Sequence, residues 1–127
     1  MPTYLVDTNV WIESFHGNEQ AREFLKKDDL FVSYVTKAEL IFGARDKRSL
    51  SNLEKILGKY GVNWGSDLVN QRALEILIKY RLKQGIGILE CMLVATALEN
   101  KMILITDNIK HFRGIEGLVV KKLSEVI

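Results

Sequence analysis

The 127-residue sequence has a single cysteine, almost no net charge and no long hydrophobic run. The cysteine, Cys91, lies in the apolar stretch LECMLVATAL, which excludes a disulfide framework and a cysteine-based metal site and suits a reducing cytoplasm. No segment approaches the roughly 18 apolar residues that a membrane-spanning helix needs, and no basic region leads into an apolar segment at the start. We therefore expect a cytoplasmic protein without membrane contact.

The charge balance does not identify a partner. A net charge of +2 is too small to indicate nucleic-acid binding by itself. Basic residues are nevertheless concentrated in two clusters, namely Arg45, Lys47 and Arg48, and then Lys110, His111 and Arg113. Taken alone, such clusters are most simply interpreted as solvated surface charge.

Length and patterning predict one α/β domain that spans residues 1–127. Strand-like segments are expected at residues 3–6, 30–33, 60–64, 102–106 and 117–123. Helical segments are expected at residues 7–15, from Thr36 to Gly43, and at residues 49–59, 67–84 and 90–100. This alternation is typical of a three-layer α/β/α architecture with a small, mainly parallel, twisted sheet.

Acidic residues fall where a parallel sheet would bring them together. Asp7 ends the first expected strand, and Asp107 with Asn108 ends another. Glu39 follows the second strand on a helix, and Glu90 opens the helix that leads into residues 102–106. Ligands bind outside the carboxyl ends of such strands, so these residues can meet at one edge. Because like charges repel, the cluster predicts a divalent cation, and its hard oxygen ligands favour Mg²⁺ or Mn²⁺ over zinc.

Each acid also has a simpler interpretation. Asp7 could be only a helix N-cap, and Glu39 only an exposed helical residue. Glu90 could merely favour the positive end of its helix, and Asp107 could be a turn residue. The joint arrangement of all four is what indicates a site.

Three segments resemble the PIN-domain ribonucleases, specifically the VapC-type toxins of toxin–antitoxin pairs. These segments are YLVDTNVWI, VSYVTKAELIFGA and ECMLVATALENKMILITDNIKHF, and their order covers nearly the whole chain. The first two acids of the family match Asp7 and Glu39. The third, normally an aspartate, matches Glu90, and the fourth position matches Asn108, with Asp107 as its acidic neighbour.

The resemblance implies Mg²⁺- or Mn²⁺-dependent hydrolysis of RNA phosphodiesters, often in tRNA or ribosomal RNA. Asp7, Glu39, Glu90, Asp107 and Asn108 would be the catalytic, metal-binding residues. Thr8, Asn9 and Thr106 would support them through hydrogen bonds. The basic residues Arg45, Lys47, Arg48, Lys110 and Arg113 become candidates for RNA contact. His16 and His111 match no acidic position of the family, so we interpret them as surface residues. The resemblance also implies a homodimer and a cognate VapB-like antitoxin.

Two rival functions are disfavoured by specific residues, and one remains open. No G-x-G-x-x-G follows a strand, which argues against dinucleotide binding. A phosphatase with two aspartates two positions apart would need an acid at Asn9. The open alternative is a PIN-fold binding protein, catalytically weakened by Glu90 and Asn108, that acts with a DNA-binding partner.

Overall fold

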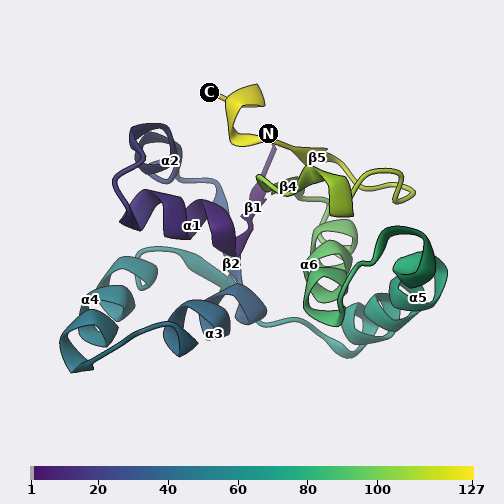
Figure 1. The fold of residues 1–127 in the computed structure, drawn as a ribbon, viewed down its shortest axis with the longest axis horizontal. Coiled ribbons are helices and arrows are strands. Elements are labelled where there is room, and N and C mark those ends of the chain that lie inside the picture. Colours follow the sequence, from purple (N-terminus) through teal and green to yellow (C-terminus); the bar gives the residue numbers. More distant parts are fainter. Residues whose placement is uncertain (1) are drawn as a thin grey trace.

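The computed structural model describes residues 2–127, and its centre is a five-stranded sheet (Figure 1). The strands are β1 (Tyr4–Val6), β2 (Leu30–Ser33), β3 (Gly61–Asn63), β4 (Ile103–Ile105) and β5 (Val120–Lys121). They are arranged in the order β3-β2-β1-β4-β5, and all four pairings are parallel. The predicted mainly parallel sheet is therefore confirmed.

Helices cover both faces of the sheet and complete the three layers. They are α1 (Thr8–Phe15), α2 (Glu19–Phe24), α3 (Tyr34–Phe42), α4 (Lys47–Leu57), α5 (Asp67–Gln84) and α6 (Ile88–Glu99), with short 3₁₀ turns η1 (Ile109–His111) and η2 (Leu123–Glu125). Figure 1 shows α1 to α4 on one side of the strands and α5 with α6 on the other. No helix within residues 2–127 is both long enough and apolar enough to cross a bilayer.

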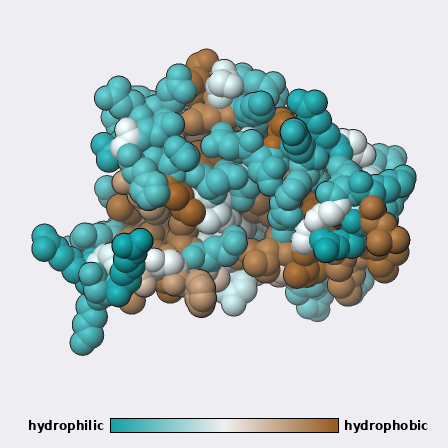
Figure 2. All heavy atoms as spheres, viewed as in Figure 1, coloured by the Kyte–Doolittle hydropathy of each residue, from teal (hydrophilic) through white to brown (hydrophobic). Residues whose placement is uncertain are grey.

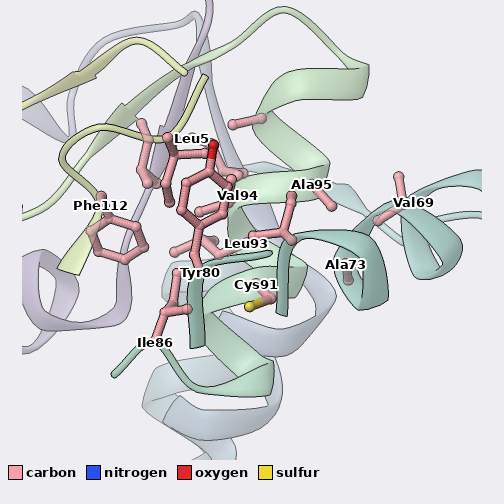
Figure 3. Close-up of a cluster of buried hydrophobic side chains, with 14 of the residues drawn as sticks. Leu5, Val69, Ala73, Tyr80, Ile86, Cys91, Leu93, Val94, Ala95 and Phe112 are labelled. Carbon is pink, nitrogen blue, oxygen red and sulfur yellow. The ribbon is translucent and has the colours of Figure 1, made fainter. Parts of the chain in front are cut away.

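Alternation along the strands creates two separate cores. Leu5 of β1 packs into the core under α5 and α6 (Figure 3). Leu104 of β4 belongs to the same core. Val6 and Ile105, one residue further along each strand, pack against α1 to α4. Because successive side chains of a strand point to opposite faces, each short central strand is buried on both sides. These buried strands fix the sheet edge at which Asp7 emerges.

Several helices begin earlier than the sequence-based expectations, and the observed caps account for two of these differences. Ser33, not Thr36, caps α3, because its hydroxyl accepts the backbone N–H of Thr36 at 3.0 Å. Asp46 similarly accepts the N–H of Ser49 and starts α4 at Lys47, two residues earlier than predicted. Helix α6 also begins two residues early. Helix α2 was not predicted at all, whereas α5 matches its expected range.

Candidate active site

Asp7 lies at the centre of the sheet edge formed by the carboxyl ends of the strands. It directly follows β1, and its backbone N–H donates to the carbonyl of Ile105 at the end of β4. The chain leaves β1 toward β2 on one side, while β4 pairs on the other. This is a topological switch point, the usual ligand-binding position in an open parallel sheet.

The Asp7 carboxylate is held by hydrogen bonds from three neighbours. Oδ1 accepts the backbone N–H of Thr8 at 2.7 Å, which makes Asp7 the N-cap of α1. Oδ2 accepts the Thr106 hydroxyl at 2.7 Å and the Asn9 amide at 3.4 Å. The predicted contacts of Thr8, Asn9 and Thr106 with this acid are therefore present. The Asp7 side chain therefore caps helix α1 and also belongs to the candidate site.

The pKa of the Asp7 carboxyl is raised above its usual value of 3.8. Burial is the largest cause, and the charges of Glu39 and Glu90 raise it further, whereas the hydrogen bonds from Thr106 and Thr8 lower it. Two acids that are distant from Asp7 in the sequence therefore act on its carboxyl group at this edge. A cation bound here would offset this repulsion.

Glu39 reaches the site from α3 and is exposed. Its Oε1 accepts the hydroxyl of Thr8 at 2.8 Å, and Thr36 Oγ1 lies 3.3 Å from the same hydroxyl. The Ser33 cap sets where α3 begins and therefore where Glu39 falls on the helix. This contact joins the start of α1 to α3 beside Asp7.

Glu90 enters the site from the third position of α6 and makes two contacts. Its Oε1 accepts the backbone N–H of Gly87 at 3.1 Å, which supports the N-terminus of α6. Its Oε2 lies 2.7 Å from Nδ1 of His111. A hydrogen bond in which this carboxylate is the acceptor needs a proton on Nδ1 of His111. Both interpretations of Glu90, helix support and site residue, have a structural basis.

His111, interpreted from the sequence as a surface residue, is partly exposed but also contacts one of the candidate acids. Its side chain is 40% exposed, but it contacts Glu90 and lies 3.0 Å from the amide nitrogen of Asn108. The 3₁₀ turn η1 brings it there from 21 residues away in the sequence. Nothing in the local sequence pattern indicated this pairing. His16, in contrast, is exposed at the end of α1, as expected.

Asp107 and Asn108 follow β4 on the same edge. The backbone N–H of Asp107 donates to the Asn9 side chain at 3.4 Å, while that of Asn108 donates to the Thr106 hydroxyl at 3.0 Å. Both side chains are exposed, and Asn108 is the one that lies against His111. The fourth position thus joins the site through backbone and amide contacts rather than through a carboxylate.

The two basic clusters flank segments that carry the acids. Arg45, Lys47 and Arg48 are exposed between α3 and the first turn of α4, and Arg45 lines the same groove as Glu39. This groove, of about 1170 Å³, lies among α1 to α4. Lys110 and Arg113 are exposed on either side of His111. Within residues 2–127, His111 of the second cluster pairs with Glu90, whereas Arg45, Lys47, Arg48, Lys110 and Arg113 form no salt bridge with the carboxylates of the site.

The donor atoms at this edge suit a hard divalent cation. Carboxylate and amide oxygens are the ligands preferred by Mg²⁺, and the hydrogen bonds to Asp7 and Glu39 do not use all their lone pairs. Across residues 2–127, however, no three His, Cys, Asp or Glu side chains already stand close enough to share a metal ion. Glu39 instead accepts from Thr8, and Glu90 from Gly87 and His111. A cation shared by three of these acids therefore requires their carboxyl groups to lie closer together than they do in this structure.

Comparisons with solved structures find close matches to the fold. The chain is similar to one from a toxin–antitoxin complex of Klebsiella pneumoniae, with a TM-score of 0.78, 26% identity and coverage of 92% of this chain and 96% of that chain. For a DNA-bound VapBC of Salmonella typhimurium the TM-score is 0.84 at 23% identity, and the match covers 97% of this chain and 99% of that chain. For VapBC-1 of nontypeable Haemophilus influenzae the TM-score is 0.79 at 24% identity, and the match covers 96% of this chain and 98% of that chain.

The comparison with family models identifies the family. The search of curated protein sequences found no match. The model of the PIN domain, however, matches residues 4–117, a range that contains every acid described above. PIN domains are generally nucleases that depend on divalent metals. The resemblance inferred from the sequence is confirmed, and the chain belongs to the PIN-domain family.

Proposed function

We propose that the protein is a Mg²⁺- or Mn²⁺-dependent endoribonuclease, the toxin of a VapBC-like toxin–antitoxin pair, which hydrolyses phosphodiesters in tRNA or ribosomal RNA. The observation that carries this proposal is the Asp7 carboxyl, which lies at the switch point of the sheet with a pKa raised partly by Glu39 and Glu90. Acids with like charges at a sheet edge are what a phosphodiesterase site needs to hold a cation.

Asp7, Glu39 and Glu90 would hold the cation, and Asp107 or Asn108 would bind it or orient a water. When bound, a divalent ion supplies charge neutralisation at the scissile phosphate and a lowered pKa for the attacking water. No covalent nucleophile from the chain is required. The protein contributes the position of its ligands and the surface on which the RNA lies.

Hydrogen-bond partners would fix these ligands in place. Thr106 and Asn9 orient the Asp7 carboxylate, and Thr8 orients Glu39. His111 would do the same for Glu90 through its Nδ1 contact. Partners of this kind typically change metal affinity or activity by about 10- to 100-fold when they are removed.

The exposed basic residues Arg45, Lys47, Arg48, Lys110 and Arg113 would contact RNA phosphates on both sides of the acids. Their charges are exposed, and their segments adjoin Glu39 and Glu90. Phosphate contacts would position the RNA, whereas the choice of RNA depends on its shape and on its unpaired bases.

A VapB-like antitoxin would bind the groove among α1 to α4. Apolar walls formed by Trp11, Phe15, Leu40, Leu53 and Ile56 share this groove with Glu39. The structural neighbours from Klebsiella and Salmonella are a toxin–antitoxin complex and a VapBC. A basic side chain of such an antitoxin would pair with Asp7 and Glu39 and displace the cation. A complex in which the antitoxin lies elsewhere and the enzyme stays active would contradict this.

A homodimer is also part of the proposal. Hydrophobic side chains gather on the surface over α5 (Figure 2). Leu74, Ile78 and Leu82 are 55%, 83% and 98% exposed and follow one another at four-residue intervals, so they form one stripe along the helix. Exposed stripes of this kind mark protein contacts. The mass of the protein in solution tests the dimer, and a monomer at micromolar concentration would contradict it.

The test of the proposed activity is cleavage of total tRNA and ribosomal RNA by the purified protein with Mn²⁺ or Mg²⁺. We expect cleavage of the RNA at discrete sites. This cleavage should disappear when EDTA is added and in the Asp7→Asn variant. Circular dichroism of the variant would show that the loss is not due to unfolding. Cuts that persist in EDTA would contradict metal dependence. A folded protein that binds a DNA-binding partner but cleaves none of these RNAs would favour the catalytically weakened binding protein.

A further inference from the structure

Two large aromatic rings lie exposed where β2 and β3 end. Tyr34 directly follows β2, Trp64 directly follows β3, and the strands are paired with Ser33 opposite Asn63. The ring centroids are 5.9 Å apart with an interplanar angle of 34°. Their exposed fractions are 52% for Tyr34 and 67% for Trp64. Neither ring is therefore part of the core, and together they form an exposed aromatic surface.

A positive charge accompanies these rings. Lys37 lies one helical turn after Tyr34, and its Nζ is 5.6 Å from the centroid of the Trp64 ring. A recess of about 150 Å³ adjoins the rings and is lined in part by Ser33, Asn63 and Asn70. Sites for drug-sized ligands usually occupy about 300–1,000 Å³, so this recess suits a smaller group such as a single base. Flat rings, an ammonium and amide side chains together match the chemistry of a nucleotide.

This aromatic surface lies on the same sheet edge as the acids. Neighbouring strands are about 4.8 Å apart, so the ends of β2 and β3 lie roughly 5 and 10 Å from the end of β1. Polar contacts connect the two places, because Ser33 caps the helix at Thr36 and Thr36 lies 3.3 Å from the hydroxyl of Thr8. An RNA strand held at the acids would therefore pass within reach of Trp64.

We propose that Tyr34, Trp64 and Lys37 form a platform that stacks an unpaired base of the RNA beside the scissile phosphodiester and pairs the Lys37 ammonium with a neighbouring phosphate. This inference rests on the proposed ribonuclease function. Aromatic stacking beside a cation is the usual way in which proteins hold single-stranded nucleic acid. Tyrosine and tryptophan are also enriched at protein interfaces, but lysine is depleted there, so the ammonium beside the rings favours a nucleic acid.

Tryptophan fluorescence gives a direct test that does not depend on cleavage. The chain has two tryptophans, and Trp11 is fully buried whereas Trp64 is largely exposed. In EDTA, a ten-nucleotide single-stranded RNA pool and total tRNA should quench the emission saturably. The quenching should disappear in Trp64→Ala. Absence of quenching in the wild-type protein with both RNAs would overturn the platform.

Affinity measurements with labelled RNA extend the test. Trp64→Ala should weaken binding by about 5- to 150-fold, the range expected for one lost stacked base, and Trp64→Phe should recover most of the affinity. Phe42→Ala is the matched control, because Phe42 is a 92% exposed ring at the other end of α3. In cleavage assays, Trp64→Ala should raise KM far more than it lowers kcat.

The outcomes separate the platform from the proposed function. If Trp64→Ala binds RNA as the wild type does but changes the mass of the protein in solution, the rings are a protein interface and the platform is wrong. If the wild type cleaves RNA and Trp64→Ala cleaves it with the same KM, the platform fails while the function stands. If RNA binding depends on Trp64 but the wild-type protein does not cleave RNA, the proposed ribonuclease function fails, while base stacking on Trp64 stands.

Discussion

His111 Nδ1 lies 2.7 Å from Glu90 Oε2, so a histidine that matches no acidic position of the family contacts one of the candidate metal ligands. Glu90 is one methylene longer than the aspartate usual at this position. Its other oxygen accepts the N–H of Gly87. In this chain, therefore, the third acid is held between a helix N-terminus and a histidine.

Removal of the His111 side chain should raise the Mn²⁺ concentration that cleavage requires. In His111→Ala, Glu90 loses the partner that orients its carboxylate, and we expect the Mn²⁺ concentration for half-maximal cleavage to rise by about 10- to 100-fold. His16→Ala is the control, because His16 is exposed at the end of α1. An unchanged Mn²⁺ dependence in His111→Ala would show that the contact has no role in the site.

Glu90→Asp should retain or improve cleavage. Aspartate is the usual family residue here, and it keeps an acid in the first turn of α6, so the free energy of unfolding should change by less than about 1 kcal/mol. Initial rates at saturating Mn²⁺ and a denaturant titration check both expectations. Complete loss of activity in a folded variant would show that the longer side chain is integral to this site.

Asp7→Asn should be at least as stable as the wild type in EDTA at neutral pH. The raised pKa means that the native state binds a proton at Asp7 more tightly than the unfolded chain does. Ionisation therefore costs stability as the pH rises from the unfolded pKa through the native pKa, and the loss stays constant at higher pH. The advantage of the variant should shrink as the pH falls toward 4. Thermal melts between pH 4 and 7 measure this, and a variant that is less stable at pH 7 would contradict it.

The basic residues near the acids should control the salt dependence of RNA binding. Each of Arg45→Gln and Lys110→Gln should weaken binding to all RNA sequences alike and reduce the slope of log affinity against log salt by about 0.7 if one phosphate contact is lost. Lys101→Gln is the control, because Lys101 is exposed before β4, at the opposite edge of the sheet. Equal slopes in all four proteins would exclude both clusters from the RNA-binding surface.

Cys91 should be inert in the folded protein. It is fully buried, and burial, with a smaller contribution from the charge of Glu90, raises the pKa of its thiol to about 11. Because the thiolate is the reactive form, a disulfide reagent at pH 8 should label it only after unfolding in guanidinium, with one thiol per chain. Rapid stoichiometric labelling of the native protein would mean that the core around α6 opens readily.

Much of the fold could be predicted because the hydrophobic pattern of each long element is strong. Helix α5 follows a helical period over 18 residues and ends at Gly85, which has a positive φ of 70°. Helix α2 has only six residues, and just Ala21 and Phe24 are buried, so it leaves no periodic signal. The start of α3 was missed because Ser33 and Thr36 are both good caps, and only the structure shows which side chain bonds the backbone.

The candidate site was predictable where an acid follows a strand and unpredictable where contacts cross between elements. Asp7 could be identified from the buried strand before it. The pairing of His111 with Glu90 depends on how η1 folds back toward α6, which no local spacing encodes. The contact between Tyr34 and Trp64 similarly depends on the pairing of β2 with β3.

Direct binding of Mn²⁺ tests the central claim that these acids share a cation. Electron paramagnetic resonance of free Mn²⁺ should show its signal decrease as wild-type protein is added, because bound ions lose the sharp aqueous spectrum. Asp7→Asn and Glu39→Gln, both folded, should bind Mn²⁺ much more weakly than the wild type. Equal binding by the wild type and both variants, or no binding by the folded wild type, would contradict a shared cation.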